Sequence, residues 1–201
     1  MLKNVALAPM KMLKLARMIN PPDSRDVRSR RMVAVIDCVL NQNVRDAGAA
    51  VSPAMNWDVL TLCREHDVGI MQMPCPEQAC LGLARTRQAG LSIREVLDIE
   101  AGRQCCARLA GETVDRIQSF VEAGYQVLAV LGGNPGSPGC AVHHGANGLL
   151  DSSGVFIHAL QAELETRHIE LPMLAMRDHD RALLSQDIER LRQLLATSSR
   201  S

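Results

Sequence analysis

The sequence predicts an α/β domain of three layers, in which a mostly parallel β-sheet lies between two layers of α-helices. Short apolar runs alternate along the chain with longer segments of helical periodicity. Each run is apolar almost throughout, as expected for a strand covered on both faces. Because strands that alternate with helices pair in parallel through right-handed crossovers, the expected topology is Rossmann-like or flavodoxin-like.

Length and composition suit one globular domain. The 201 residues are 47% apolar but only 2% aromatic, so aliphatic side chains and methionine must fill the core. Residues 1–31 hold eight lysines and arginines against two aspartates, a charge of +6, and we interpret them as a basic extension and linker. The domain is expected over residues 32–197. The rest of the chain has a net charge of −6, which disfavours a nucleic-acid surface. No apolar run reaches the roughly 18 residues of a membrane span.

Four apolar runs are predicted to form the sheet. They occupy residues 32–36, 68–73, 126–131 and 171–176. Loops rich in Pro, Gly, Asn or Glu follow the first three runs, over residues 38–48, 74–85 and 132–144. Since residues just past the carboxyl ends of parallel strands meet at one edge of a sheet, we expect these loops to lie together.

Helical periodicity fills the segments between these runs. Helices are expected over residues 57–66, 92–123, 155–167 and 180–196, the second of them in two pieces if it breaks near Gly111. The last helix places Leu184, Ile188 and Leu191 on one face. Either Asp178 or Asp180 is expected to cap its start.

Three cysteines stand at equivalent places, one in each loop: Cys38, Cys75 and Cys140. Three converging thiolates would make a soft metal site with an open coordination position. The alternative is that each is a small buried hydrophobic residue. Zinc is less natural, because structural zinc takes four protein ligands and no C-x-x-C spacing is present.

The remaining cysteines are expected to have no part in this site. Cys63, Cys105 and Cys106 fall inside predicted helices and are interpreted as core or surface residues, whereas Cys80 is a spare thiol that could supply a fourth ligand. Seven cysteines are an odd number, and the amino terminus lacks a long apolar stretch. We therefore expect a cytoplasmic protein whose thiols bind metal or react rather than pair.

Polar residues in the same loops are candidates for chemistry. Glu77 is either a solvated carboxylate or a general acid/base beside the metal. Ser137 is either a turn residue or a hydrogen-bond donor to substrate. Asn41 and Asn43, with Gln42 between them, either bind an amide edge of a ligand or satisfy the loop backbone. The glycine-rich run 132–139 lacks the Lys-Ser/Thr ending of a phosphate-binding P-loop.

Together these loops resemble the TudS-related desulfidases, the thiouracil desulfidase family, in its single-domain branch. The matching segments are residues 38–43 (CVLNQN), 74–77 (PCPE) and 136–140 (GSPGC), and the stretch from Gly154 into a Leu- and Glu-rich helix also fits. The resemblance spans residues 32–195. The order and spacing of the motifs carry it rather than any one of them.

The resemblance implies a cofactor and a reaction. It assigns Cys38, Cys75 and Cys140 as ligands of a 4Fe-4S cluster that leaves one iron without a protein ligand. The implied enzyme is a hydrolase that removes sulfur from a thiolated pyrimidine such as thiouracil, or from a similar small thioamide, and releases sulfide. Glu77 would then activate water or move the proton and Ser137 would orient the substrate, a small molecule rather than a membrane or nucleic acid.

Two residues depart from the family pattern. The family often has Ser where Gly139 stands, and this branch often has His where Asp37 stands. Both departures bear on which substrate is used. Two alternatives stay open: an iron–sulfur protein that stores or transfers sulfur, and a Rossmann-like binding module, not an enzyme, whose cysteines are inert.

Overall fold

A four-stranded parallel sheet forms the centre of the protein. The computed structural model describes residues 25–197, so most of the predicted basic extension lies outside the described residues. The strands are β1 (Arg31–Ile36), β2 (Gly69–Met73), β3 (Gln126–Leu131) and β6 (Met173–Leu174), arranged in the order β2-β1-β3-β6. Each neighbouring pair is parallel.

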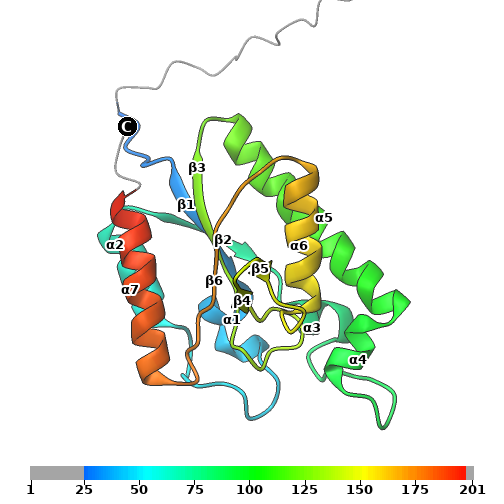
Figure 1. Ribbon diagram of the computed structural model, residues 1–201. Helices are drawn as coiled ribbons and strands as arrows, with labels where there is room; N and C mark the ends of the chain where they lie inside the picture. Colours follow the sequence, from blue (N-terminus) through cyan, green and yellow to red (C-terminus); the bar gives the residue numbers. More distant parts are fainter. Residues whose placement is uncertain (1–24, 198–201) are drawn as a thin grey trace, which may run out of the picture.

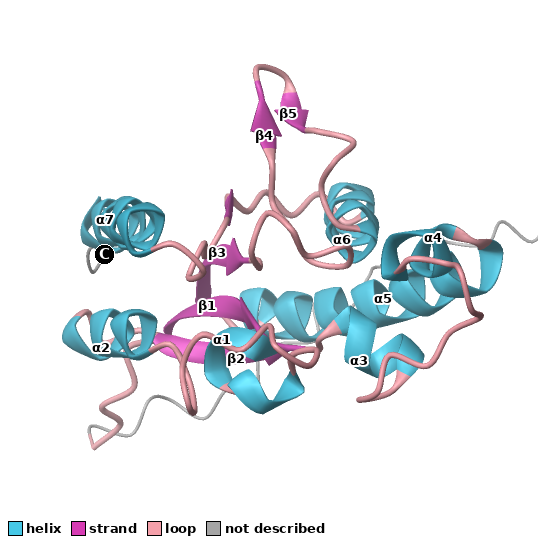
Figure 2. Cartoon of the chain, turned by 90° about the horizontal axis from the view of Figure 1, so that it is seen from below, coloured by secondary structure: helices cyan, strands magenta, loops and turns pink. Residues whose placement is uncertain are grey.

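Helices cover both faces of this sheet, which confirms the predicted fold class. On one side lie α2 (Trp57–Glu65) and α7 (Arg181–Thr197), and on the other lie α5 (Glu100–Glu122) and α6 (Val155–Thr166) (Figures 1 and 2). All six residues of β1 are buried, as expected for a central strand between two helical layers.

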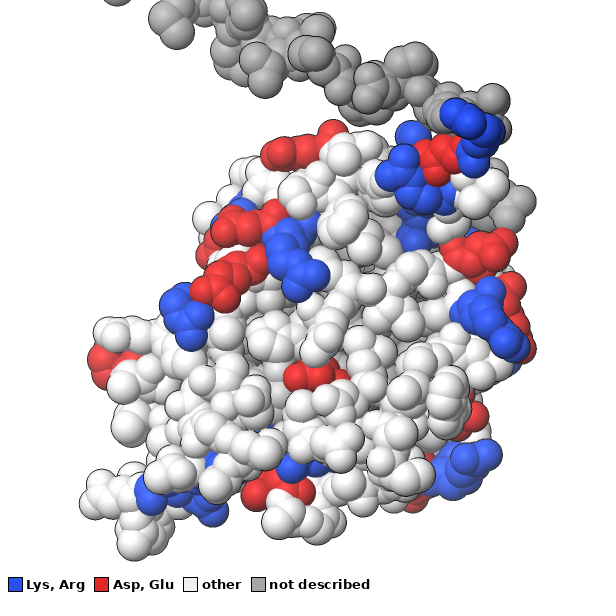
Figure 3. Space-filling model, turned by 180° about the vertical axis from the view of Figure 1, so that it is seen from behind, with Lys and Arg blue, Asp and Glu red and all other residues white. Residues whose placement is uncertain are grey.

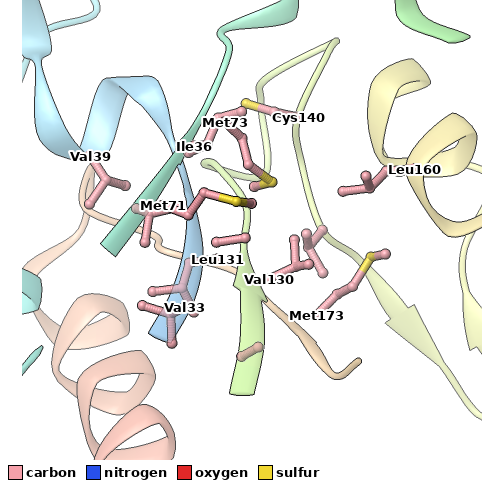
Figure 4. Close-up of a cluster of buried hydrophobic side chains, with 14 of the residues drawn as sticks. Val33, Ile36, Val39, Met71, Met73, Val130, Leu131, Cys140, Leu160 and Met173 are labelled. Atoms are coloured by element: carbon pink, nitrogen blue, oxygen red, sulfur yellow. The ribbon is translucent and has the colours of Figure 1, made fainter. Parts of the chain in front are cut away.

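The core is aliphatic and reaches the carboxyl edge of the sheet. Figure 4 shows Val33 and Ile36 of β1 close to Met71 and Met73 of β2, with Leu160 of α6 at one side. Cys140 belongs to the same buried cluster and lies at its end (Figure 4). The centre of the molecule therefore continues without a break into the loops that carry the cysteines.

The predicted break in the long helix was placed at the wrong residue. The segment does form two helices, but they are α4 (Ile93–Asp98) and α5, and the extended residue between them is Ile99. At Gly111 the helix runs on unbroken. A Cβ atom on Gly102 would lie 2.2 Å from the Val96 carbonyl oxygen, so the first turn of α5 packs directly on α4 at this glycine.

Other differences from the predicted elements are small and local. The last strand was expected over residues 171–176 but pairs only at Met173 and Leu174, because Pro172 has no N–H to donate and only its carbonyl bonds to β3. Short helices interrupt the first two predicted loops, namely α1 (Asp37–Leu40), the 3-10 turn η1 (Gln42–Val44) and α3 (Pro76–Leu81). A hairpin of β4 (His144–Gly145) and β5 (Gly148–Leu149) follows the third loop.

Asp180 is the residue that caps the last helix. Its Oδ1 accepts hydrogen bonds from the backbone N–H groups of Ala182, at 2.8 Å, and Leu183, at 3.0 Å. These bonds lower the pKa of Asp180. The other candidate, Asp178, does not cap the helix but pairs with Arg45.

Acidic and basic side chains are interspersed on the back of the molecule (Figure 3). On the face in Figure 3, acidic and basic groups lie close to one another near the edges, while much of the middle is uncharged. Among residues 25–197, no helix has the length and apolar character needed to cross a membrane.

Candidate functional site

The three cysteines lie at the carboxyl edge of three adjacent strands. Cys38 is the second residue of α1, directly after β1, and Cys75 is the residue that precedes α3, just after β2. Cys140 follows β3 by way of the loop that starts at Gly132. Because β1 lies between β2 and β3 in the sheet, the fold gathers all three loops at one place, near α1 and α3 in Figure 2.

The cysteine thiols are buried and interact with one another. A hydrogen bond with Cys140, together with the Arg45 guanidinium, lowers the pKa of Cys38. The same hydrogen bond and burial raise the pKa of Cys140 well above its ordinary value. Burial raises the pKa of Cys75 to about 11, and its charge also interacts with that of Cys38.

Each of the three sulfurs also faces a polar side chain. The Arg45 Nη2 atom lies 3.8 Å from the Cys38 Sγ atom, and the Arg85 Nη2 atom lies 3.7 Å from the Cys75 Sγ atom. The Ser137 Oγ atom lies 3.0 Å from the Cys140 Sγ atom. Cys63 and Cys106 differ from these three cysteines in what sets their pKa. Burial alone raises the pKa of each to about 11, with no contribution from a charged or hydrogen-bonding side chain.

The donor set fits a thiolate-held cluster. Over residues 25–197, no group of three or more His, Cys, Asp or Glu side chains is placed so that it could hold a metal ion, so the fit is one of residue types. The Arg85 Nε atom is buried without a hydrogen-bond partner, 3.8 Å from Glu77 Oε2, while Nη2 of the same side chain faces Cys75. Cysteine-only ligation with hydrogen-bond donors around the sulfurs is typical of iron–sulfur centres. The residues that could hold such a group are Cys38, Cys75 and Cys140.

Glu77 and Ser137 form a hydrogen-bonded unit beside Cys140. The Ser137 hydroxyl lies 2.8 Å from the Glu77 Oε1 atom, and the Gly139 backbone N–H donates to the same oxygen at 3.3 Å. Glu77 is 9% exposed and stands in the first turn of α3, where Pro76 occupies the first position. The two predicted catalytic residues are thus in contact, although they are 60 positions apart in the sequence.

Close packing explains why a glycine stands at position 139. A Cβ atom there would lie 2.6 Å from the Pro76 Cγ atom and 3.3 Å from the Glu77 Cγ atom. The serine common in the resembling family has no room at this position. Asp37, the other departure, is 8% exposed, and its Oδ1 accepts a hydrogen bond of 2.8 Å from the Gln72 side chain. Burial raises the pKa of Asp37.

Asn41 and Asn43 mainly organise their own loop. The Asn41 side chain accepts hydrogen bonds from the backbone N–H and the side-chain amide of Asn43, at 3.1 and 2.9 Å, and so caps η1. Both residues are exposed. Gln42 between them is buried and donates to the Cys38 carbonyl oxygen at 2.7 Å. That Asn41 and Asn43 bind substrate stays a prediction.

Sequence reasoning missed the polar group that fixes Arg45. The Asp178 carboxylate accepts two hydrogen bonds from Arg45 Nη2, at 2.8 and 2.7 Å, and the exposed fractions of the two side chains are 7% and 3%. Asn134 donates to the Asp178 Oδ1 atom at 2.7 Å. Asp178 stands two residues after the predicted strand run 171–176, so its place shortly after a strand end was the available signal.

A cavity of about 930 Å³ opens beside these residues. Cys38, Cys75, Glu77 and Ser137 line it, together with Arg45. Its other walls include the segment after η1, residues 134–138, the start of α4 and His179. Asn41 and Asn43 are not among its lining residues. The volume lies within the range of roughly 300–1,000 Å³ that is usual for small-molecule sites.

The structure pairs two of the remaining cysteines. Cys80 in α3 and Cys105 in α5 form a disulfide, with 6.0 Å between their Cα atoms. Cys80 is therefore not a free fourth ligand, and the expectation that the thiols do not pair was wrong for Cys80 and Cys105. Cys63 and Cys106 are free and buried, so of the two interpretations, core or surface, they are core residues. The disulfide ties α3, which carries Glu77, to the long helix behind it.

Comparison with protein-family models and with solved structures gives no match. Among curated proteins, the uncharacterized protein MJ0003 of Methanocaldococcus jannaschii is 24% identical over 104 residues. These residues are 52% of this chain and 64% of that protein, so the match covers less than two thirds of the relative. The name of that protein states no function.

Proposed function

We propose that this protein is an iron–sulfur-dependent desulfidase, a hydrolase similar to the TudS-related thiouracil desulfidases. It would remove sulfur from a thiolated pyrimidine, or from a similar small thioamide, and release sulfide. The observation that carries the proposal is the set of three buried cysteines at adjacent strand ends, each with a polar side chain at its sulfur. An inert core cysteine needs no such partner.

Cys38, Cys75 and Cys140 would hold a 4Fe-4S cluster with one iron free of protein ligands. When bound, that iron supplies a Lewis acid suited to the soft sulfur of a thiocarbonyl group. The cavity beside Cys38 and Cys75 offers room for a small substrate. A soft sulfur atom of the substrate would be directed toward this side of the cavity.

Glu77 is the proposed general base. In the net reaction water adds to the carbon of the C=S group, the C–S bond breaks, and the products are a C=O group and hydrogen sulfide. Glu77 would take one proton from the attacking water and give it to the sulfur, and would take the second from the hydroxyl on carbon and give it to the sulfur as the C–S bond breaks. The Ser137 hydroxyl and the Gly139 N–H both contact Glu77 Oε1 and hold the carboxylate in place.

Ser137 is the proposed orienting residue, and the exposed amides of Asn41 and Asn43 are proposed to contact substrate at the edge of the site. The Ser137 hydroxyl also reaches Cys140, so it links the proton-transfer residue to a cluster ligand.

We propose a cytoplasmic location, which five free cysteines out of seven support, although the Cys80–Cys105 disulfide shows that one pair can be oxidised.

Sulfide release from 2- and 4-thiouracil by anaerobically reconstituted protein tests the proposal. The parent should release one sulfide per uracil formed. Glu77→Gln should keep its iron and lose most of the turnover, whereas Cys38→Ala, Cys75→Ala and Cys140→Ala should lose iron and activity together. The matched controls Cys63→Ala and Cys106→Ala remove equally buried thiols and should keep both.

The outcomes separate this function from its rivals. Iron bound without sulfide release from any thioamide tested would favour a protein that stores or transfers sulfur. Iron content that is unchanged in all three cysteine variants would leave a binding module with inert cysteines. Full turnover in iron-loaded Glu77→Gln would remove Glu77 from the mechanism.

A further inference from the structure

Two arginines are directed at two of the three proposed cluster ligands. Arg45 approaches Cys38 from the loop after α1, and Arg85 approaches Cys75 from the segment after α3, with nitrogen-to-sulfur distances of 3.8 and 3.7 Å. Both arginines line the cavity. Arginine guanidinium groups keep their charge at all ordinary pH values, so each brings a permanent positive charge to a sulfur atom.

Arg85 is a buried cation with mostly neutral partners. It is 1% exposed and donates to the carbonyl oxygens of Gly82, Leu83 and Val44. Its nearest carboxylate contact, from Nε to Glu77 Oε2, is 3.8 Å, and that Nε atom has no hydrogen-bond partner. A buried charge is costly unless an opposite charge lies nearby. The Glu77 carboxylate supplies one such charge at 3.8 Å, and an anionic sulfur at Cys75 would supply a second.

Arg45 is held in place by the Asp178 carboxylate, whose negative charge opposes part of the effect of Arg45 on Cys38. Asp178 accepts two hydrogen bonds from Arg45 Nη2 and is fixed in turn by the side-chain amide of Asn134. Gln42 also approaches Asp178 Oδ2, at 3.3 Å, while it donates to the Cys38 carbonyl oxygen. The loops after β1, β3 and β6 together fix the guanidinium that faces Cys38.

We infer that Arg45 and Arg85 are positioning residues that offset the negative charge of the three-cysteine centre and raise its reduction potential. The inference rests on the proposed iron–sulfur function and deepens it. Net charge and hydrogen bonds to sulfur set the potential of a cluster. Because the reduced centre is the more negative form, removing a positive charge beside it disfavours reduction and shifts the midpoint to more negative values.

The test is a redox titration, followed by electron paramagnetic resonance, of protein reconstituted without oxygen. Arg45→Gln and Arg85→Gln should each shift the midpoint to more negative potential, and Arg45→Lys and Arg85→Lys should restore part of the shift. The control is Arg167→Gln, which removes an ion-paired arginine at the end of α6 remote from the site and should leave the midpoint unchanged. Arg45→Gln keeps the test decisive if Arg85→Gln fails to fold.

Different results would refute the role of the two arginines and the desulfidase proposal. If the parent and Arg167→Gln take up the cluster and both glutamine variants keep the parent midpoint, the charge-offset role is refuted and the desulfidase proposal stands. If the parent takes up no cluster after reconstitution, the function and this inference fall together.

Discussion

Gly139 leaves no room for a larger side chain beside Glu77, and Gly139→Ala tests the geometry of the site. The backbone here is not left-handed, so alanine can adopt it and the effect of the substitution is steric. The new Cβ atom would lie 2.6 Å from the Pro76 Cγ atom, closer than carbon atoms approach one another. A proline ring cannot rotate away, so α3 and the loop around Cys140 must separate.

The expected cost follows from that separation. Overpacking in a buried region costs about 1–3 kcal/mol. The Gly139 N–H bond to Glu77 is stretched as well, and a hydrogen bond to a charged group contributes about 1.5–3 kcal/mol. We therefore expect Gly139→Ala to lower the free energy of unfolding by at least about 1 kcal/mol and to lower the iron content after reconstitution.

Urea unfolding followed by circular dichroism measures the change, and the same loop supplies the control. A Cβ atom on Gly136 would meet no atom within 4 Å, and its backbone is not left-handed either. Gly136→Ala should therefore stay within about 0.5 kcal/mol of the parent. Adding Pro76→Ala to Gly139→Ala removes the obstructing ring and should recover part of the loss. Equal unfolding midpoints for Gly139→Ala and Gly136→Ala would refute the reasoning.

Three further predictions concern the rest of the molecule. Because the Cys80–Cys105 disulfide spans 25 residues, Cys105→Ser should lower the free energy of unfolding in urea by up to about 3.5 kcal/mol when no reductant is present. With reductant, the parent and the variant should unfold alike. A variant that matches the parent in both conditions would contradict this. The pKa of Asp180 is lowered in the folded protein, so the charged cap should stabilise the fold above the unfolded pKa of 3.8. This stabilisation should be lost as the pH falls through the folded pKa. The difference in unfolding free energy between the parent and Asp180→Ala should therefore vanish in acid, and a difference that stays constant with pH would contradict the reasoning. Burial raises the pKa of Cys63 to about 11, so iodoacetamide at pH 8 should label it only in urea, and mass spectrometry showing rapid native labelling would contradict its burial.

The sheet was predictable because its strands are short, apolar and buried on both faces. The runs that became β1, β2 and β3 were placed within one residue of their observed ends. The fourth run was predicted too long, since apolar composition does not show that Pro172 and a position at the edge limit pairing to two residues. The helix break was misplaced because a glycine such as Gly111 can also continue a helix. The close packing of α5 on α4 at Gly102 depends on tertiary contacts, which the sequence does not show.

The candidate site was predictable only where local rules apply. A cysteine after each of three adjacent parallel strands must lie at one edge of the sheet. The pairing of Arg45 with Asp178 joins residues 133 positions apart, and no spacing rule predicts it. The partner of Cys80 was equally hidden, since its link to Cys105 depends on how α3 packs on α5.

Iron and acid-labile sulfide analysis of the protein, reconstituted without oxygen, tests the central claim most directly. The account predicts about four irons and four sulfides per chain, as expected for one 4Fe-4S cluster. It also predicts that Cys38→Ala, Cys75→Ala and Cys140→Ala lose most of this iron while Cys63→Ala keeps it. A parent protein that holds neither iron nor labile sulfide after reconstitution would contradict the account.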